Sequence, residues 1–294
     1  MTRSILITDI AHFVGGPSAR ALLAEGASVY GVDASFTDAA ARAAFEEKAP
    51  GVKTLAAQKP EEAVAAVIDA EGRLDVLINN DAWPAVRGPV DEATDKDMHE
   101  TFEALVFKSF AMTRAAVPQM KKQKAGKILF LSSAAPMNGI PNYSIYAAAR
   151  GAANALALTL AKELASHNIQ VNALGFNFIE SPDYFPASLL DDPKSRDKIL
   201  GNIPLRRLGK PEEAAAIVAF LAGPTSDFIT GQLIPVAGGW ATARLFNIAI
   251  GASVGPISSW ITRSAIWSSS VGSRFRIASI APFRFARIGN PAAG

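Results

Sequence analysis

Three side chains near the middle of the chain have the types and the spacing of a proton-transfer site. Ser133 follows an apolar run at residues 127–131, and Tyr146 comes thirteen residues later. Arg150 comes four residues after Tyr146, so on a helix the two side chains share one face. A fixed cation beside a phenol stabilises its phenolate form. A hydroxyl, a phenol and a cation together can remove the proton from an alcohol.

The chain around these residues alternates between apolar strands and helices. Strands are expected at residues 4–8, 28–33, 52–57, 74–78, 127–131, 169–174 and 232–239. Helices are expected at residues 17–26, 39–49, 61–72, 95–122, 146–166 and 211–223, the fourth with a kink near Lys108 and Ser109. Strands that are apolar throughout and alternate with helices are typical of a parallel sheet covered on both faces. The sequence therefore predicts a single α/β domain with a doubly wound parallel sheet of about seven strands.

Several polar residues follow the ends of predicted strands. They are Asn79, Ser133 and the loop that begins at Gly175. In doubly wound sheets a ligand lies in the crevice at the carboxyl ends of the strands. We therefore expect these residues to meet in one site.

The spacing of Ser133 and Tyr146 resembles the active site of the short-chain dehydrogenase/reductase superfamily. In that superfamily a lysine comes four residues after the tyrosine, and Arg150 stands in its place here. The resemblance covers residues 3–240. It implies a Rossmann-like fold, with residues 1–240 as one catalytic domain.

The turn after the first strand departs from the superfamily at the dinucleotide site. The superfamily binds NAD(P) through a glycine-rich turn whose backbone approaches the diphosphate. Thr8 and Gly15 match that turn, but Asp9 and Phe13 stand where its first two glycines are expected. A carboxylate near a diphosphate and a ring against it both oppose binding, so we expect no cofactor. Asp33 matches the ribose-binding acid and is interpreted as a relic.

The chain also resembles one branch of this superfamily, the halohydrin dehalogenases, and within it the B-type enzymes. The shared features are the triad Ser133, Tyr146 and Arg150, the His12-Phe13 pair, the Asn80-Asp81 pair, and the stretches 132–136 and 175–186. The resemblance implies a cofactor-independent conversion of vicinal halohydrins to epoxides and halide. It also implies the reverse reaction, in which small anions such as cyanide, azide or nitrite open an epoxide.

The same resemblance assigns roles to individual residues. Tyr146 would take the proton of the substrate hydroxyl and Ser133 would orient it, with Arg150 as the cation. A halide pocket of amides, polar contacts and an apolar wall would be formed by Phe13, Phe176, Asn177, Phe178 and Ile179. Loop residues that would shape the substrate pocket are Trp83, Met137 and Phe185, although ordinary packing explains each of them as well.

Two other functions compete with this interpretation. The first is an NAD(P)-dependent short-chain reductase with a degenerate cofactor motif, which tight dinucleotide binding would support. The second is a non-catalytic relative that senses a small ligand. A binding-only protein has little need of a phenol beside a cation, so the intact pair of Ser133 and Tyr146 favours an enzyme.

Composition excludes several classes of site and partner. The chain has no cysteine and three scattered histidines, so neither a disulfide nor a metal site is expected. Residues 241–294 hold six of the 29 basic side chains and no acidic one, which leaves 23 basic and 27 acidic side chains elsewhere. Because residues 1–240 are net acidic, nucleic acid is not expected as a partner.

No apolar run is long enough for a membrane span, and no signal peptide is evident, so a cytoplasmic enzyme is expected.

The last part of the chain differs from the rest. Residues 241–294 have nine serines and six arginines but no lysine or acid, and their short apolar clusters lack a sustained period. They are interpreted as an appended tail outside the catalytic core.

Broad apolar faces on the helices around residues 100–122 and 147–166, together with the family resemblance, predict a homotetramer.

Overall fold

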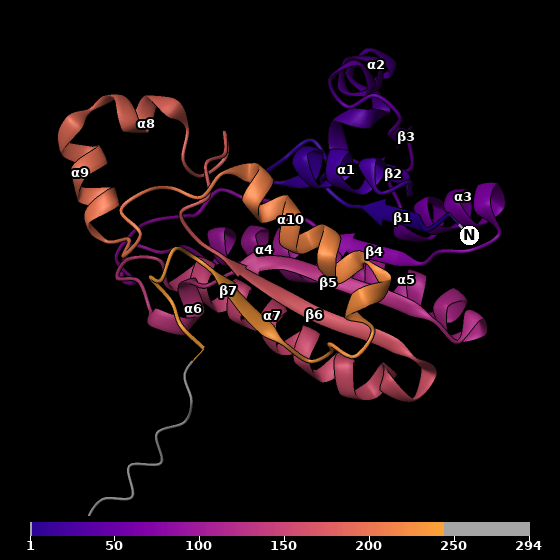
Figure 1. Cartoon of the computed structure of the whole chain (residues 1–294). Coiled ribbons are helices and arrows are strands. Elements are labelled where there is room, and N and C mark those ends of the chain that lie inside the picture. The colour runs from indigo at the N-terminus through magenta and orange to yellow at the C-terminus, as the bar shows by residue number, and fades with distance from the viewer. Residues whose placement is uncertain (1, 244–294) are drawn as a thin grey trace, which may run out of the picture. The chain divides into compact units, whose positions relative to one another are not determined.

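The computed structural model describes residues 2–243 (Figure 1). The tail interpretation concerns residues 241–294, and all but the first three of these lie outside the described range. Within that range, no helix combines the length and the apolar character that crossing a membrane requires.

The strands of residues 2–243 form one sheet in the order β3-β2-β1-β4-β5-β6-β7 (Figure 1). They are β1 (Ser4–Ile7), β2 (Ser28–Val32), β3 (Lys53–Leu55), β4 (Val76–Asn79), β5 (Gly126–Ser133), β6 (Ile169–Phe176) and β7 (Leu233–Val236). Every pair of neighbouring strands is parallel. The chain crosses from β3 to the other side of β1 at β4, so the predicted doubly wound sheet of seven strands is confirmed.

Helical segments connect the strands. They are α1 (Gly15–Ala24), η1 (Ala34–Thr37), α2 (Ala39–Lys48), α3 (Pro60–Glu71), α4 (Asp95–Phe102), η2 (Glu103–Phe107), α5 (Lys108–Gln123), α6 (Ala135–Asn138), α7 (Ser144–Leu164), η3 (Ala165–His167), α8 (Ala187–Asp191), α9 (Pro193–Gly201), α10 (Pro211–Ala222) and η4 (Pro224–Ser226). All six predicted helices are present. The short helices α6, α8 and α9 were not predicted, and they follow the strand ends at which the candidate site lies.

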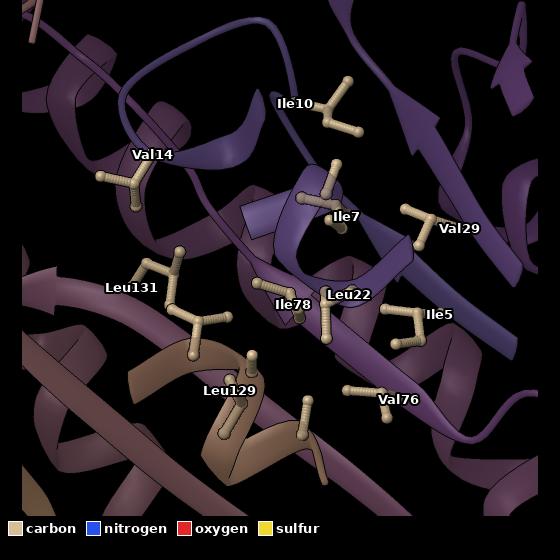
Figure 2. Close-up of a cluster of buried hydrophobic side chains, with 14 of the residues drawn as sticks. Ile5, Ile7, Ile10, Val14, Leu22, Val29, Val76, Ile78, Leu129 and Leu131 are labelled. Atoms are coloured by element: carbon tan, nitrogen blue, oxygen red, sulfur yellow. The ribbon is translucent and has the colours of Figure 1, made fainter. Parts of the chain in front are cut away.

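Two buried clusters cover the two faces of the sheet. Ile5 and Ile7 of β1 pack with α1 and α10, whereas Leu6 between them packs with α3, α5 and α7. Figure 2 shows the first cluster, in which side chains from β1, β4, β5 and α1 meet. Successive strand residues point to opposite faces, so a strand buried on both faces must be apolar throughout. Each buried leucine or isoleucine contributes about 1.5–3 kcal/mol to folding.

The long helix predicted at residues 95–122 is interrupted by a π-helical segment. This segment, η2, lies just before the predicted kink at Lys108 and Ser109. The hydroxyl of Ser109 donates to the carbonyl oxygens of Leu105 and Val106 at 3.3 and 3.0 Å. A serine that bonds to carbonyls of the preceding turn loosens the regular ladder. Leu105 is thereby buried in a small cluster that includes Tyr146.

Candidate active site

Ser133 is the last residue of β5 and lies at the carboxyl edge of the sheet. The strand runs two residues beyond its predicted end, which places Ser133 beside Phe176 of β6. Its hydroxyl oxygen accepts a hydrogen bond from the amide of Ala135 at 3.0 Å. Its carbonyl oxygen accepts from Nδ2 of Asn154 at 3.2 Å. The hydroxyl is thus fixed as an acceptor and keeps its own proton for a ligand.

Tyr146 and Arg150 lie one turn apart on α7, as their spacing predicts. They are 9% and 3% exposed, and Cζ of Arg150 is 5.4 Å from the centroid of the Tyr146 ring. The guanidinium donates to the carbonyl oxygens of Leu131 and Asp81 and to the hydroxyl of Tyr184, at 3.3, 3.1 and 3.1 Å. Burial opposes its charge, but the adjacent Tyr146 and Tyr184 raise the pKa of Arg150 on balance. Arg150 is therefore a cation fixed in place.

Tyr184 lies beside Tyr146 and Arg150 in the site, and the sequence analysis did not single it out. Its hydroxyl accepts from Arg150, donates to the carbonyl of Trp83 at 3.0 Å and accepts from the amide of Trp83 at 3.3 Å. Its ring centroid is 6.4 Å from that of Tyr146. Burial raises the pKa of Tyr184 to about 12, so it remains a neutral phenol. Tyr184 stands within the stretch 175–186 that carries the family resemblance, but nothing in the sequence distinguishes it from Phe185.

Two carboxyl groups, those of the buried Asp81 and the half-buried Asp9, follow the ends of β4 and β1. Asp81 accepts from the hydroxyl of Thr8 at 3.2 Å, and Asp9 accepts from the amide of Ala82 at 3.2 Å. Burial raises the pKa of both groups, and that of Asp81 reaches about 7. A group that changes charge near neutral pH therefore lies next to the fixed cation. Among residues 2–243, no group of three His, Cys, Asp or Glu side chains could hold a metal ion.

A cavity of about 620 Å³ opens at this edge of the sheet. It brings together nine of the residues predicted for the site, namely Phe13, Ser133, Tyr146, Arg150, Phe176, Asn177, Phe178, Ile179 and Phe185. Further lining residues that the sequence did not single out include Arg87, Tyr143, Tyr184 and Trp240. Ser133 and the loop after β6 therefore line one cavity, whereas Asn79 does not, and its Nδ2 donates to the hydroxyl of Thr113 at 3.1 Å.

Trp83 and Met137 do not line this cavity, contrary to expectation. The Trp83 side chain packs into the cluster of Leu105 and Tyr146, and its backbone holds the hydroxyl of Tyr184. Met137 lies on the short helix α6 and packs against the buried cluster of Ala134, Ala237 and Ala241. Both residues pack into neighbouring clusters, and neither lines the cavity.

The turn at residues 177–179, which is predicted to bind a halide, already uses two of its amide donors within the protein. The amide of Asn177 donates to the carbonyl of Val236 at 3.2 Å, and the amide of Phe178 donates to Oδ1 of Asn177 at 2.9 Å. Phe178 has a left-handed backbone with φ of 57°. Within the described chain, the amide of Ile179 and Nδ2 of Asn177 make no hydrogen bond. Both of these donors belong to residues that line the cavity, whereas the amide of Phe178 is already used within the turn.

The turn after β1 does not fit a dinucleotide. Asp9 and Phe13 both adopt left-handed backbones, with φ of 42° and 47°. The ring of Phe13 packs edge-on against Phe176 and Tyr184, at centroid distances of 5.5 and 5.4 Å. Its amide donates to the carboxylate of Asp183 at 2.6 Å. A diphosphate would need that amide and would meet the carboxylates of Asp9 and Asp183 instead.

Two solved structures similar to this chain are dehalogenases by name. A structure described as a dehalogenation enzyme is 43% identical with a TM-score of 0.80, and the match covers 82% of this chain and 98% of that one. A halohydrin dehalogenase bound to ethyl (2S)-oxiran-2-ylacetate is 36% identical with a TM-score of 0.78, covering 83% of this chain and 99% of that one.

The family model and the relatives that match this chain in sequence are reductases by description. A family model described as Enoyl-(Acyl carrier protein) reductase matches residues 11–241. The 3-oxoacyl-[acyl-carrier-protein] reductase FabG of Thermotoga maritima is 34% identical over 242 residues, which are 80% of this chain and 96% of that protein. The family model covers strands β2 to β7 and the Ser133, Tyr146 and Arg150 site. The chain therefore belongs to the short-chain dehydrogenase/reductase superfamily.

Proposed function

We propose that this protein is a halohydrin dehalogenase that converts vicinal halohydrins to epoxides and halide without a nicotinamide cofactor. One observation carries the proposal. The pair of Tyr146 and Arg150 faces a cavity whose dinucleotide turn is closed by Phe13 and Asp183. The similar solved dehalogenases support the same reaction class, and one of them was bound to an oxirane, which is an epoxide.

The chemistry follows from the placement of the side chains. Tyr146, beside the cation of Arg150, takes the proton of the substrate hydroxyl. Ser133 donates a hydrogen bond to the same oxygen and orients it. The alkoxide then attacks the neighbouring carbon, so that a C–O bond forms as the C–halogen bond breaks. The halide leaves with the bonding electron pair, and nothing is oxidised or reduced.

The leaving halide needs hydrogen-bond donors and an apolar wall. The amide of Ile179 and Nδ2 of Asn177 provide donors that no described residue uses. Phe13, Phe176 and Phe178 provide the wall of the cavity beside them. A backbone turn that presents amides can bind an anion without a full positive charge.

The same site runs in reverse. An epoxide oxygen takes the place of the alkoxide and receives the proton of Tyr146 as the ring opens. A small anion held at the halide position attacks the carbon. Cyanide, azide and nitrite are the anions of this size that we expect the protein to accept.

A second candidate function is an NAD(P)-dependent reductase, which the sequence similarity to the Thermotoga maritima FabG protein favours. It would need the first turn to accept a diphosphate despite Asp9, Phe13 and Asp183. The two functions differ in whether turnover depends on added nicotinamide.

Halide release from 1,3-dichloro-2-propanol by the purified protein, with no nicotinamide added, tests the proposal. Catalytic release with epoxide formed supports dehalogenation, and Tyr146→Phe is the blank. No release, combined with measurable NADPH or NADH binding, would assign the protein to the reductases. Neither release nor dinucleotide binding would favour a ligand sensor.

The protein is further proposed to assemble as a homotetramer. Phe107 and Phe110, at the junction of η2 and α5, are 52% and 44% exposed, which is unusual for aromatic side chains on one helical stretch. Light scattering after gel filtration tests this. A monomer of 30.9 kDa would overturn it.

A further inference from the structure

We propose that Asp183 is a positioning residue whose carboxylate binds the turn after β1 as an internal anion and so holds Phe13 at the wall of the active-site cavity. The effect on turnover rests on the proposed function, but the contact itself does not. Asp183 lies in the loop between β6 and α8, 170 residues from the turn that it binds.

Both oxygens of the Asp183 carboxylate contact the turn. Oδ2 accepts from the amide of Phe13 at 2.6 Å, and Oδ1 lies 3.0 Å from Nδ1 of His12. The turn leads directly into α1, whose N-terminus favours a negative charge. A turn of this kind before a helix is where nucleotide-binding sheets hold a phosphate. Here the anion comes from the protein itself.

The contact between Asp183 and the turn includes an ion pair with His12 when the imidazole of His12 is protonated. Its other ring nitrogen, Nε2, lies 3.8 Å from Oδ2 of the buried Asp33. The hydrogen bond to Asp183 raises the pKa of His12, and the same bond lowers the pKa of Asp183. Asp183 and His12 are 25% and 49% exposed in their side chains, so solvent screens the pair in part. The shorter bond, to the amide of Phe13, is the more specific contact.

Phe13 needs such a contact because of its backbone. Its φ of 47° is a left-handed conformation that a residue with a Cβ rarely adopts. The bond to Asp183 fixes the amide, and the edge-on contacts with Phe176 and Tyr184 fix the ring. Tyr184 follows Asp183 directly in the chain, so one short segment holds both the backbone and the ring of Phe13.

Phe13 also lines two cavities. It lines the active-site cavity and a second cavity of about 390 Å³, whose other walls include Pro17, Phe36 and Phe45. Loss of the Asp183 contact would free the turn, let the ring move and enlarge the halide pocket. Binding of halide and substrate should then weaken more than the chemical step.

Full-length Asp183→Ala, Asp183→Asn and the control Asp191→Ala test this inference. Asp191 is an exposed residue at the end of α8 in the same connection. Amide hydrogen exchange of residues 9–16 should speed up at least fivefold in Asp183→Ala and stay unchanged in Asp191→Ala. With 1,3-dichloro-2-propanol, the KM and the bromide inhibition constant should both rise about fivefold or more, while kcat changes less than twofold. Asp183→Asn should be intermediate, because its amide oxygen still accepts from Phe13 but carries no charge.

Unchanged exchange and unchanged constants in a folded Asp183→Ala protein would overturn the inference. If that variant does not fold, the same comparison is made with Asp183→Asn, which keeps the side-chain shape and is expected to differ from wild type at least twofold. A wild-type protein that releases no halide would defeat the proposed function alone. The exchange of residues 9–16 would still decide whether Asp183 holds the turn.

Discussion

The guanidinium of Arg150 lies 5.4 Å from the ring centroid of Tyr146, and both side chains are buried at the same cavity. The phenol and its cation are therefore fixed by one helical turn, and the hydroxyl of Tyr184 accepts a hydrogen bond from the cation. This geometry makes separate predictions for each of the three residues.

Replacement of Tyr146 by phenylalanine should abolish halide release while the fold is kept. The ring still fills its site, but no group remains to take the substrate proton. A positioned acid or base contributes about 10²- to 10⁴-fold to the rate, so a loss of that size is expected. Initial rates of halide release and thermal melting measure the two effects. Tyr143→Phe removes a phenol from the same cavity and should retain activity; equal rates for the two variants would refute the role of Tyr146.

Arg150→Lys should impair the reaction without stopping it. Lysine keeps the charge but lacks the planar fork that reaches Leu131, Asp81 and Tyr184 together. Loss of hydrogen bonds to a charged group costs about 1.5–3 kcal/mol each, so kcat should fall roughly 10- to 100-fold. Arg150→Met, which removes the charge as well, should lose more. Rates equal to wild type in Arg150→Lys would show that the fork has no part in turnover.

Tyr184→Phe should weaken both the fold and the reaction. Removal of the hydroxyl leaves a guanidinium nitrogen of Arg150 and the carbonyl of Trp83 without this partner. We expect the free energy of unfolding to fall by about 1–3 kcal/mol, together with a lower kcat. A double-mutant cycle with Arg150→Lys measures the coupling, and additive effects on kcat would contradict a shared role.

Asp81 should make the protein less stable as the pH rises toward neutrality. Burial raises the pKa of Asp81 from 3.8 to about 7 in the folded state. Between these values the folded protein binds more protons than the unfolded chain, so this contribution is full below pH about 4 and is lost as the pH rises through 7. Asp81→Asn cannot ionise, and its stability should therefore decline less across this window. Urea unfolding at several pH values measures the slope, with the exposed Asp69→Asn as a control. A wild-type slope in Asp81→Asn would mean that Asp81 does not titrate in this range.

Local pattern was sufficient to predict much of this site. The apolar runs located all seven strands, and the four-residue spacing placed Tyr146 and Arg150 on one face of α7. The doubly wound order then brought Ser133 and the loop after β6 to the same edge. These features depend on periodicity and chain order, which the sequence carries directly.

Side-chain direction in the loops could not be predicted in the same way. Trp83 and Met137 were expected in the pocket and pack into neighbouring clusters instead, contacts for which the local sequence carries no signal. The partner of Asp183 is 170 residues away, and no local signal connects the two. The π-helical break lies close to the predicted kink, and the Ser109 hydroxyl that bonds to carbonyls of this segment is a local feature of the sequence.

The left-handed backbone at Phe13 sets what engineering of this turn would require. Glycine adopts such torsions freely, whereas phenylalanine adopts them at a cost. Replacement of Phe13 by glycine would therefore suit the main-chain shape, but it would leave the carboxylate of Asp183 against the amide of residue 13. A designed phosphate site at this turn would need Asp183 replaced in the same protein, because only then is the amide free to bind an external anion.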